Sequence, residues 1–282
     1  MFRFALCADD YAITPGVSRG ILELLETGHL TAVSALVTGP AWAAASGDLK
    51  PFAGSVDIGL HLNLTLGAPL GAMRGLSPSG RFPALGKLVR SVLLGRVATA
   101  EMADEIGRQI DAFAQHFGRW PDYVDGHQHV HALPGVRDAL FRILQEQGLS
   151  GPLWLRDPGD RLHAILARPL RGKALAGAGL TAGFASAATA SGFALNEGFA
   201  GFSDFAASRD YGALFPSFLR SPGRRHLVMC HPGHSDDNLA SLDPAVLSRD
   251  AELAFLLSPG FADVLAKHSA ALMRLSEERG SH

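Results

Sequence analysis

Short apolar runs alternate with longer stretches of helical periodicity through most of the 282-residue chain. The strand-like runs fall at residues 2–8, 31–37, 56–64, 123–131, 153–156 and 226–231. Helical periodicity covers residues 17–27, residues 102–113 and residues 136–147, and Gly28 and Gly118 are placed to end the first two helices. Repeated strand and helix units of this kind predict an α/β fold with a parallel sheet, either closed into a barrel or doubly wound.

The reactive side chains of the sequence stand at or near the ends of these strand-like runs. In parallel α/β folds, binding and catalytic groups gather at the carboxyl ends of the strands. We therefore expect one site at that edge of the sheet. Its candidate members are Asp9, Asp10, His61, His127, Arg156 and His231.

Composition indicates how many domains the chain can form and which classes of partner it is expected to bind. With 47% hydrophobic residues, the chain can bury the core of one α/β domain, which we expect to cover residues 1–282. A net charge of -2 predicts no nucleic-acid partner and no attraction to an anionic membrane. The chain has no 18-residue apolar span, so no membrane span is predicted, and Met1 precedes no signal-peptide pattern.

Both cysteines, Cys7 and Cys230, lie inside apolar runs. They are typical of small buried thiols rather than of a disulfide framework. A cytoplasmic location is the expectation that fits them best.

The amino-acid composition changes over residues 162–205, which are rich in Ala, Gly and Ser and poor in charged residues. Two interpretations stay open for this Ala/Gly-rich insertion: a closely packed pair of helices, or a mobile segment over the site. Its apolar character also makes it a possible homodimer surface.

Residues 125–131 read DGHQHVH, with an acidic residue and three histidines at alternate positions. On a strand, alternate side chains point to the same side about 6.6 Å apart, so these four would form one polar stripe. His127 and His131 would then lie too far apart to share a metal bonded at about 2.1 Å. The stripe offers one or two ligands, and the others must come from elsewhere.

Asp9, Asp10 and His61 are the ligands that other strand ends offer. Two imidazoles and one carboxylate leave coordination positions open for water and substrate, as a hydrolytic metal centre requires. The second carboxylate of the acidic pair is then free to act as a base. Taken alone, an acidic pair is more often a helix cap or a turn, and His231 before a proline can simply end a strand.

Four motifs in this order resemble a known family. They are ADDY at 8–11, GLHLNLT at 59–65, DGHQHVH at 125–131 and MCHPG at 229–233. Together they resemble the YdjC-like carbohydrate deacetylases, which include chitooligosaccharide deacetylase and the hopanoid-biosynthesis deacetylase. The segments TGHLTAVSALV at 27–37 and RDAELAFLLSP at 249–259 are similar to that family too, and the similarity is weakest over 162–205.

The resemblance implies a deviant (β/α) barrel and one divalent metal ion held by Asp10, His61 and His127. It also implies that Asp9 is the general base and His231 the general acid. One departure is visible, because Ala12 stands where the family often has glycine in ADDFG.

The expected reaction is metal-dependent hydrolysis of the N-acetyl group of an acetylated amino sugar or oligosaccharide, releasing acetate. Zinc or magnesium is the expected ion, and Arg156 is expected to bind the substrate or to orient Asp9. Two other classes stay open: a metal-dependent sugar isomerase or epimerase, and a noncatalytic metal- or sugar-binding protein.

Overall fold

Parallel strands form the centre of the computed structural model, which describes residues 1–206, 208–243 and 246–277. In this described part the strands are β1 (Phe2–Tyr11), β2 (Ala32–Ala35), β3 (Asp57–Leu62), β4 (Tyr123–Gly126), β5 (Trp154–Leu155), β6 (Ala194–Leu195), β7 (Phe199–Ala200), β8 (His226–Cys230) and β9 (Ala270–Leu272). Hydrogen-bonded neighbours follow the order β6-β5-β4-β3-β2-β1-β8-β7, and β9 pairs with the start of β1.

This order is that of a (β/α) barrel with one open seam. Strands β1 to β6 follow one another in sequence, and β8 and β7 continue from the other side of β1, always in parallel. Within the described residues, the ladder is interrupted only between β6 and β7. The predicted α/β fold with a deviant, parallel-stranded barrel is confirmed.

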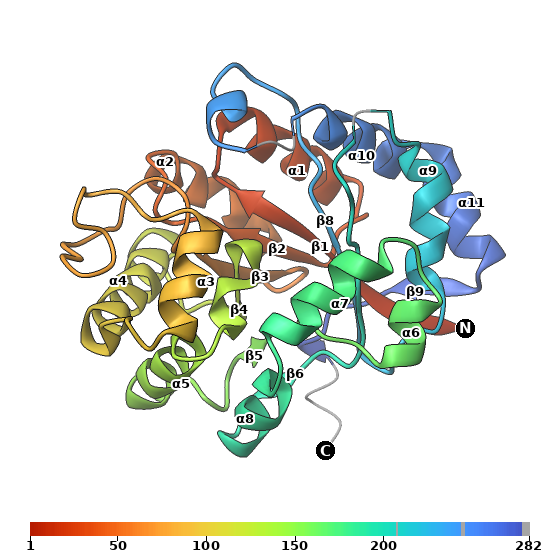
Figure 1. Ribbon diagram of the computed structural model, residues 1–282. Coiled ribbons are helices and arrows are strands. Elements are labelled where there is room, and N and C mark those ends of the chain that lie inside the picture. The colour runs from red at the N-terminus through yellow and green to blue at the C-terminus, as the bar shows by residue number, and fades with distance from the viewer. Residues whose placement is uncertain (207, 244–245, 278–282) are drawn as a thin grey trace.

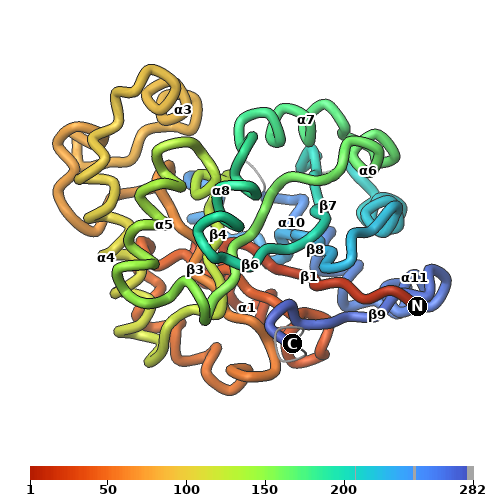
Figure 2. The backbone as a smooth tube through the Cα atoms, turned by 90° about the horizontal axis from the view of Figure 1, so that it is seen from below, coloured from red at the N-terminus to blue at the C-terminus, as the bar shows by residue number. Residues whose placement is uncertain are grey.

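Helices surround the strands in both views of the backbone (Figures 1 and 2). They are α1 (Pro15–Glu26), α2 (Trp42–Ala45), α3 (Leu85–Leu93), α4 (Thr99–Phe117), α5 (Val136–Glu146), α6 (Leu162–Leu166), α7 (Arg171–Leu180), α8 (Phe184–Ala190), α9 (Tyr211–Leu214), α10 (Leu247–Leu257) and α11 (Pro259–Lys267). Short 3-10 helices are η1 (Ser46–Phe52), η2 (His127–Ala132), η3 (Phe215–Leu219) and η4 (Leu239–Ser241).

Local sequence signals explain where the long helices begin and end. Thr14 caps α1 by accepting a hydrogen bond from the backbone N–H of Val17. Gly28 and Gly118 follow α1 and α4 with φ of 73° and 95°, a left-handed conformation that glycine adopts without steric cost. Both predicted helix ends are therefore confirmed.

Helix α4 helps to hold the site because it packs against β3, which carries His61. Its buried face includes Phe113, whose ring stacks on Trp42 with centroids 5.2 Å apart. Truncating a buried phenylalanine such as this to alanine costs about 3–5 kcal/mol.

The predicted strand over residues 123–131 is wrong beyond Gly126. Strand β4 stops there, and His127–Ala132 forms the 3-10 helix η2. Gln128 and His129 have φ of 55° and 60°, so the chain turns and the histidines do not form one stripe. Gly126 permits this turn, because a Cβ there would lie 3.0 Å from the backbone nitrogen and Nδ1 of His131.

Residues 162–205 form three helices, α6 to α8, rather than a pair, and they also contribute β6 and β7 to the sheet. In Figure 2, α6 and α7 lie on the same side of the molecule as α3. Within the described residues, no helix combines the length and the apolar character that crossing a membrane requires.

Candidate metal centre

Three side chains from distant segments meet at the carboxyl ends of the strands. They are Asp10 near the end of β1, His61 in β3 and His127 at the start of η2, and all three are buried. Asp10 Oδ1 lies 2.9 Å from His127 Nδ1 and 3.4 Å from His61 Nε2. The potential ligand atoms all lie within 4.8 Å of one another, so the structure brings together the three residues predicted as metal ligands.

The backbone around Asp10 adopts an uncommon conformation. Asp10 and Ala12 both have φ of 69°, in the left-handed region. For a residue with a Cβ this conformation costs about 1–2 kcal/mol, a cost that glycine avoids. The turn after β1 therefore keeps its shape with alanine at position 12, at some expense of stability.

Asp125 fixes the orientation of His61. The two residues are paired across β3 and β4, and His61 Nδ1–H donates to Asp125 Oδ1 over 2.7 Å. This bond leaves His61 Nε2 facing Asp10, which is the arrangement that metal-binding histidines commonly show. Burial disfavours the charged imidazolium, but Asp125 and Asp9 outweigh it and raise the pKa of His61 to about 10.

The donor set fits a small divalent cation. One carboxylate oxygen and two imidazole nitrogens come together from three separate segments, and such a set suits zinc while leaving positions for water and substrate. A second group of potential ligands, Cys7, Asp9 and Asp125, differs because Arg156 already lies among its members. Of the two groups found in the described part of the chain, only the first is suited to a metal ion.

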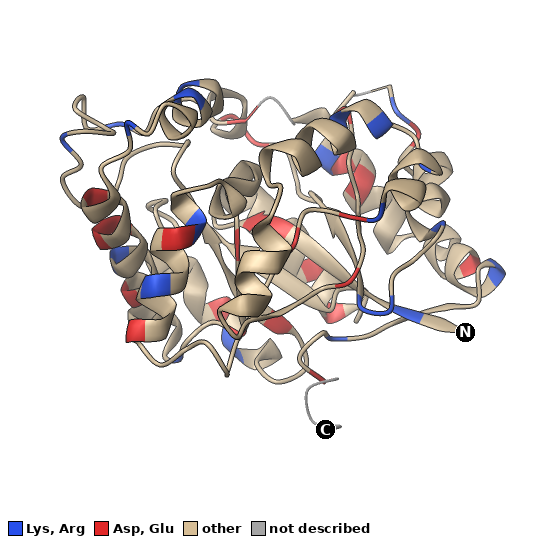
Figure 3. Cartoon of the chain, turned by 60° about the horizontal axis from the view of Figure 1, so that its bottom comes forward, with Lys and Arg blue, Asp and Glu red and all other residues tan. Residues whose placement is uncertain are grey.

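Arg156 is fully buried and binds Asp9 with both ends of its guanidinium. Nη1 donates to Asp9 Oδ2 over 2.7 Å and Nη2 to Oδ1 over 2.6 Å. Nη2 also lies 2.5 Å from Asp125 Oδ2. Burial disfavours the Asp9 carboxylate, but Arg156 outweighs it and holds the pKa of Asp9 well below its usual value. Figure 3 shows acidic residues near the middle of the molecule as well as on its outer helices.

His231 follows β8 and also lies near Asp9. Its Nε2 is 4.0 Å from Asp9 Oδ2, and its ring contacts Phe205 edge to face with centroids 5.1 Å apart. Burial lowers the pKa of His231 to about 4, against the opposing effect of Asp9 and Asp10. The imidazole is therefore neutral in the resting site at neutral pH.

The other two histidines of the HQHVH sequence have different surroundings. His131 is buried, and its Nε2–H donates to the carbonyl oxygen of Arg156 over 2.7 Å, which ties η2 to the end of β5. His129 packs edge to face on Phe199 and Phe202 and lines the cavity described next.

A cavity of about 370 Å³ opens onto Asp9, Asp10, His61, His127 and His231. Its volume lies in the range of about 300–1,000 Å³ that is usual for small-molecule sites. The outer wall comes from α3, α7 and the segment after β7, through Leu85, Lys173, Ala176, Gly177, Leu180, Thr181, Phe202 and Phe205. The Ala/Gly-rich segment thus forms part of the site.

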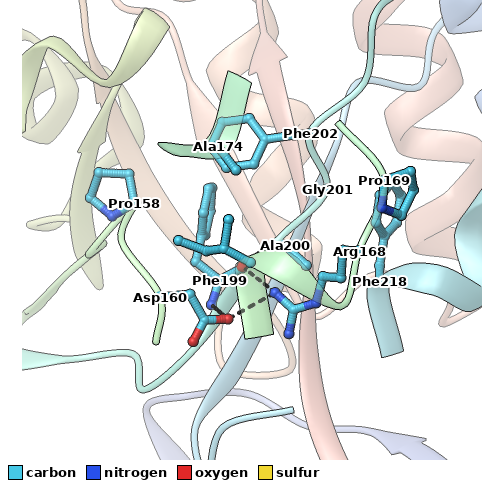
Figure 4. A pocket seen from close by; sticks show the side chains of 11 residues that line it. Pro158, Asp160, Arg168, Pro169, Ala174, Phe199, Ala200, Gly201, Phe202 and Phe218 are labelled. Carbon is cyan, nitrogen blue, oxygen red and sulfur yellow. Dashed lines mark hydrogen bonds and ion pairs between the residues drawn. The ribbon is translucent and has the colours of Figure 1, made fainter. Parts of the chain in front are cut away.

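A second cavity, of about 20 Å³, is lined by Ala174 of α7 together with Asp160, Arg168 and Phe199 (Figure 4). Arg168 donates to Asp160 Oδ2 and to the carbonyl oxygen of Phe199, both over 2.8 Å. This volume holds about one water molecule. Its polar groups fasten the α6 region to β7 and thereby place Phe199 beside His129.

Sequence reasoning missed several charged residues that contact the site, and Lys173 and Asp243, which line the cavity, are among them. Arg249 and Glu252 of α10 bind Asp10 and the backbone of His231, respectively. The available signal was the family-like sequence RDAE at 249–252, where Arg249, Asp250 and Glu252 place three charges within one turn of α10.

Comparison with known proteins finds similarity to carbohydrate deacetylases. A mouse protein named carbohydrate deacetylase is 35% identical over 187 residues, which cover 60% of this chain and 59% of that protein. A chitooligosaccharide deacetylase of Klebsiella pneumoniae (strain 342) is 35% identical over 144 residues, covering 51% of this chain and 56% of that protein. The matched part is thus less than two thirds of the length of either relative.

A solved structure shares the fold over almost the full length. It is described as a candidate cellobiose-phosphate cleavage protein from Enterococcus faecalis V583, with a TM-score of 0.75, 22% identity and 98% coverage of both chains. The sequence also matches a family model described as YdjC-like protein over residues 3–267. The chain therefore belongs to the YdjC-like protein family.

Proposed function

We propose that the chain is a metal-dependent hydrolase that removes the N-acetyl group of an acetylated amino sugar or oligosaccharide. The observation that carries the proposal is the convergence of Asp10, His61 and His127, with Asp9 and His231 beside them, at the base of one cavity. The relatives named carbohydrate deacetylase and chitooligosaccharide deacetylase support this class of substrate.

Asp10, His61 and His127 would hold the cation. A divalent ion in this position supplies Lewis acidity toward a water molecule and toward the amide carbonyl group. Asp125 keeps Nε2 of His61 directed at the site, and Asp10 presents Oδ1 to the same point. Zinc or magnesium fits the proposal, because the set mixes imidazole with carboxylate.

Asp9 is the proposed general base. Arg156 holds its carboxylate ionised and fixes both oxygens, so Asp9 can take a proton from the attacking water without rotating away. Full burial and two bonds to Asp9 favour this orienting role for Arg156 over direct substrate binding.

His231 is the proposed general acid. As the bond between the carbonyl carbon and the nitrogen breaks, its Nε2 delivers a proton to the leaving amine, and acetate and an amino sugar are the products. Because the resting imidazole is neutral, the proton that Asp9 takes from the attacking water passes to His231 Nε2, which lies 4.0 Å from Asp9 Oδ2, and from there to the leaving amine. Phe202 and Phe205 offer apolar faces on which a sugar ring can pack.

The test is an acetate-release screen over N-acetylated sugars, with metal-stripped and metal-restored protein. Acetate released only after metal is restored would support the proposal. A turnover product that keeps its acetyl group would favour the isomerase or epimerase class, and metal or sugar binding without turnover would favour a noncatalytic protein.

The proposal includes one catalytic domain and a cytoplasmic location, which the two free, buried cysteines fit. The homodimer stays a prediction.

A further inference from the structure

Helix α10 presents two buried charges to the candidate site. The side chains of Arg249 and Glu252 stand one turn apart, and the residues are 0% and 2% exposed. Burying an arginine or a glutamate is costly unless each finds a well-placed partner. What these two bind therefore indicates why the chain retains them.

Arg249 binds the outer oxygen of Asp10. Its Nη2 donates to Asp10 Oδ2 over 2.6 Å and to Asp243 Oδ2 over 2.7 Å. The other oxygen of Asp10, Oδ1, is the one that faces His127 and His61. With Oδ2 engaged, the carboxylate is held with a single oxygen directed at the metal position.

Glu252 binds the chain segment that carries His231. Its Oε2 accepts a hydrogen bond from the backbone N–H of His231 over 2.6 Å. Two residues later, the N–H of Gly233 donates to the carbonyl oxygen of Arg249 over 3.3 Å. These two bonds fasten the turn after β8 to α10 and so fix the backbone position from which the His231 side chain extends.

We propose that Arg249 and Glu252 are separate positioning residues of one helix. Arg249 acts through Asp10 and sets the geometry of the metal position, whereas Glu252 acts through His231 and sets the geometry of proton delivery. The inference deepens the proposed function and rests on it.

The two roles predict different losses. In Arg249→Lys the charge stays but the planar fork is lost, so zinc affinity should fall about tenfold to a hundredfold, the usual effect of removing a partner of a metal ligand. In Glu252→Leu the zinc affinity should stay within about twofold, while kcat falls about tenfold or more and KM changes little. Glu252→Gln keeps an oxygen that accepts the His231 N–H, so it should recover most of kcat.

The experiment measures zinc affinity by competition with a chelating dye, kcat and KM by acetate release, and folding by thermal unfolding. Arg249→Met is the second arginine variant, and Leu247→Ala, at an exposed position of the same helix, is the matched control. The control should match the wild type in every readout.

Lower zinc affinity in the Arg249 variants, together with lower kcat at unchanged zinc affinity in Glu252→Leu, would support the inference. Wild-type zinc affinity in both arginine variants, or wild-type kcat in Glu252→Leu, would overturn it, and so would losses of affinity and kcat that rise together with loss of stability in all variants. A wild-type protein that neither binds zinc nor releases acetate would instead overturn the proposed function, and the inference with it.

Discussion

Arg156→Met tests whether this arginine belongs to the framework of the site. Arg156 is 0% exposed and faces two buried carboxylates, Asp9 at 2.6 Å and Asp125 at 2.5 Å. Methionine fills a similar volume but leaves both charges without their cation. Removing one partner of a buried ion pair costs about 3–5 kcal/mol, a large share of the roughly 5–15 kcal/mol that stabilises an ordinary domain.

Urea unfolding, followed by circular dichroism, measures this loss directly. Arg142→Met is the matched control, because Arg142 is 52% exposed and lies 3.9 Å from Glu146 within the same helix. Such a surface pair contributes about 0.5 kcal/mol or less. The two substitutions are chemically identical, so the difference between them reports burial and pairing.

A double variant isolates the pair. Adding Asp9→Asn to Arg156→Met removes one of the two unpaired charges, so the combined loss should be smaller than the sum of the single losses by about 1–3 kcal/mol. A loss below about 1 kcal/mol in Arg156→Met, or two losses that simply add, would refute the pairing and return Arg156 to the role of a substrate-binding residue.

Two further predictions concern the framework around the site. Gly59→Ala should lower the free energy of unfolding by about 1–3 kcal/mol, because its Cβ would lie 2.4–2.5 Å from ring atoms of Tyr123. Gly107→Ala in α4 meets nothing within 4 Å and should raise the free energy of unfolding by up to about 1 kcal/mol, so equal effects of the two variants in urea unfolding would contradict this prediction. Burial lowers the pKa of His226 to about 4, so the unfolded chain binds the extra proton first as pH falls. The contribution of His226 to the free energy of unfolding is complete above pH 6.5 and falls by about 3 kcal/mol as the pH drops toward 4. His226→Gln should therefore lose less stability than the wild type over this pH range, and stability curves that run parallel for the two proteins would contradict the prediction.

The sequence was sufficient to predict the barrel-like α/β fold and the edge at which the site lies. Strand-like runs with Asp10 just beyond one and His61 late in another report local burial and local chemistry, and parallel strands bring their ends together whatever their separation in sequence. The two-residue strands β5, β6 and β7 are too short to leave a periodic pattern, and only β5 fell inside a predicted run.

The details that failed depend on contacts that a local pattern does not contain. Alternate histidines have the spacing of a strand, yet the chain turns at Gln128 and His129. Only packing against the neighbouring strands decides between a continued strand and such a turn. Arg249 binds Asp10 from 239 residues away. Its charge was visible in the sequence, but its partner was not.

Zinc titration of the metal-stripped protein tests the central claim most directly. The account predicts one equivalent bound by the wild type, and a loss of affinity of at least about tenfold in each of Asp10→Ala, His61→Ala and His127→Ala. His163→Ala, at an exposed position, should bind as the wild type does. No binding by the wild type, or undiminished affinity after replacement of any one of the three ligands, would contradict the account.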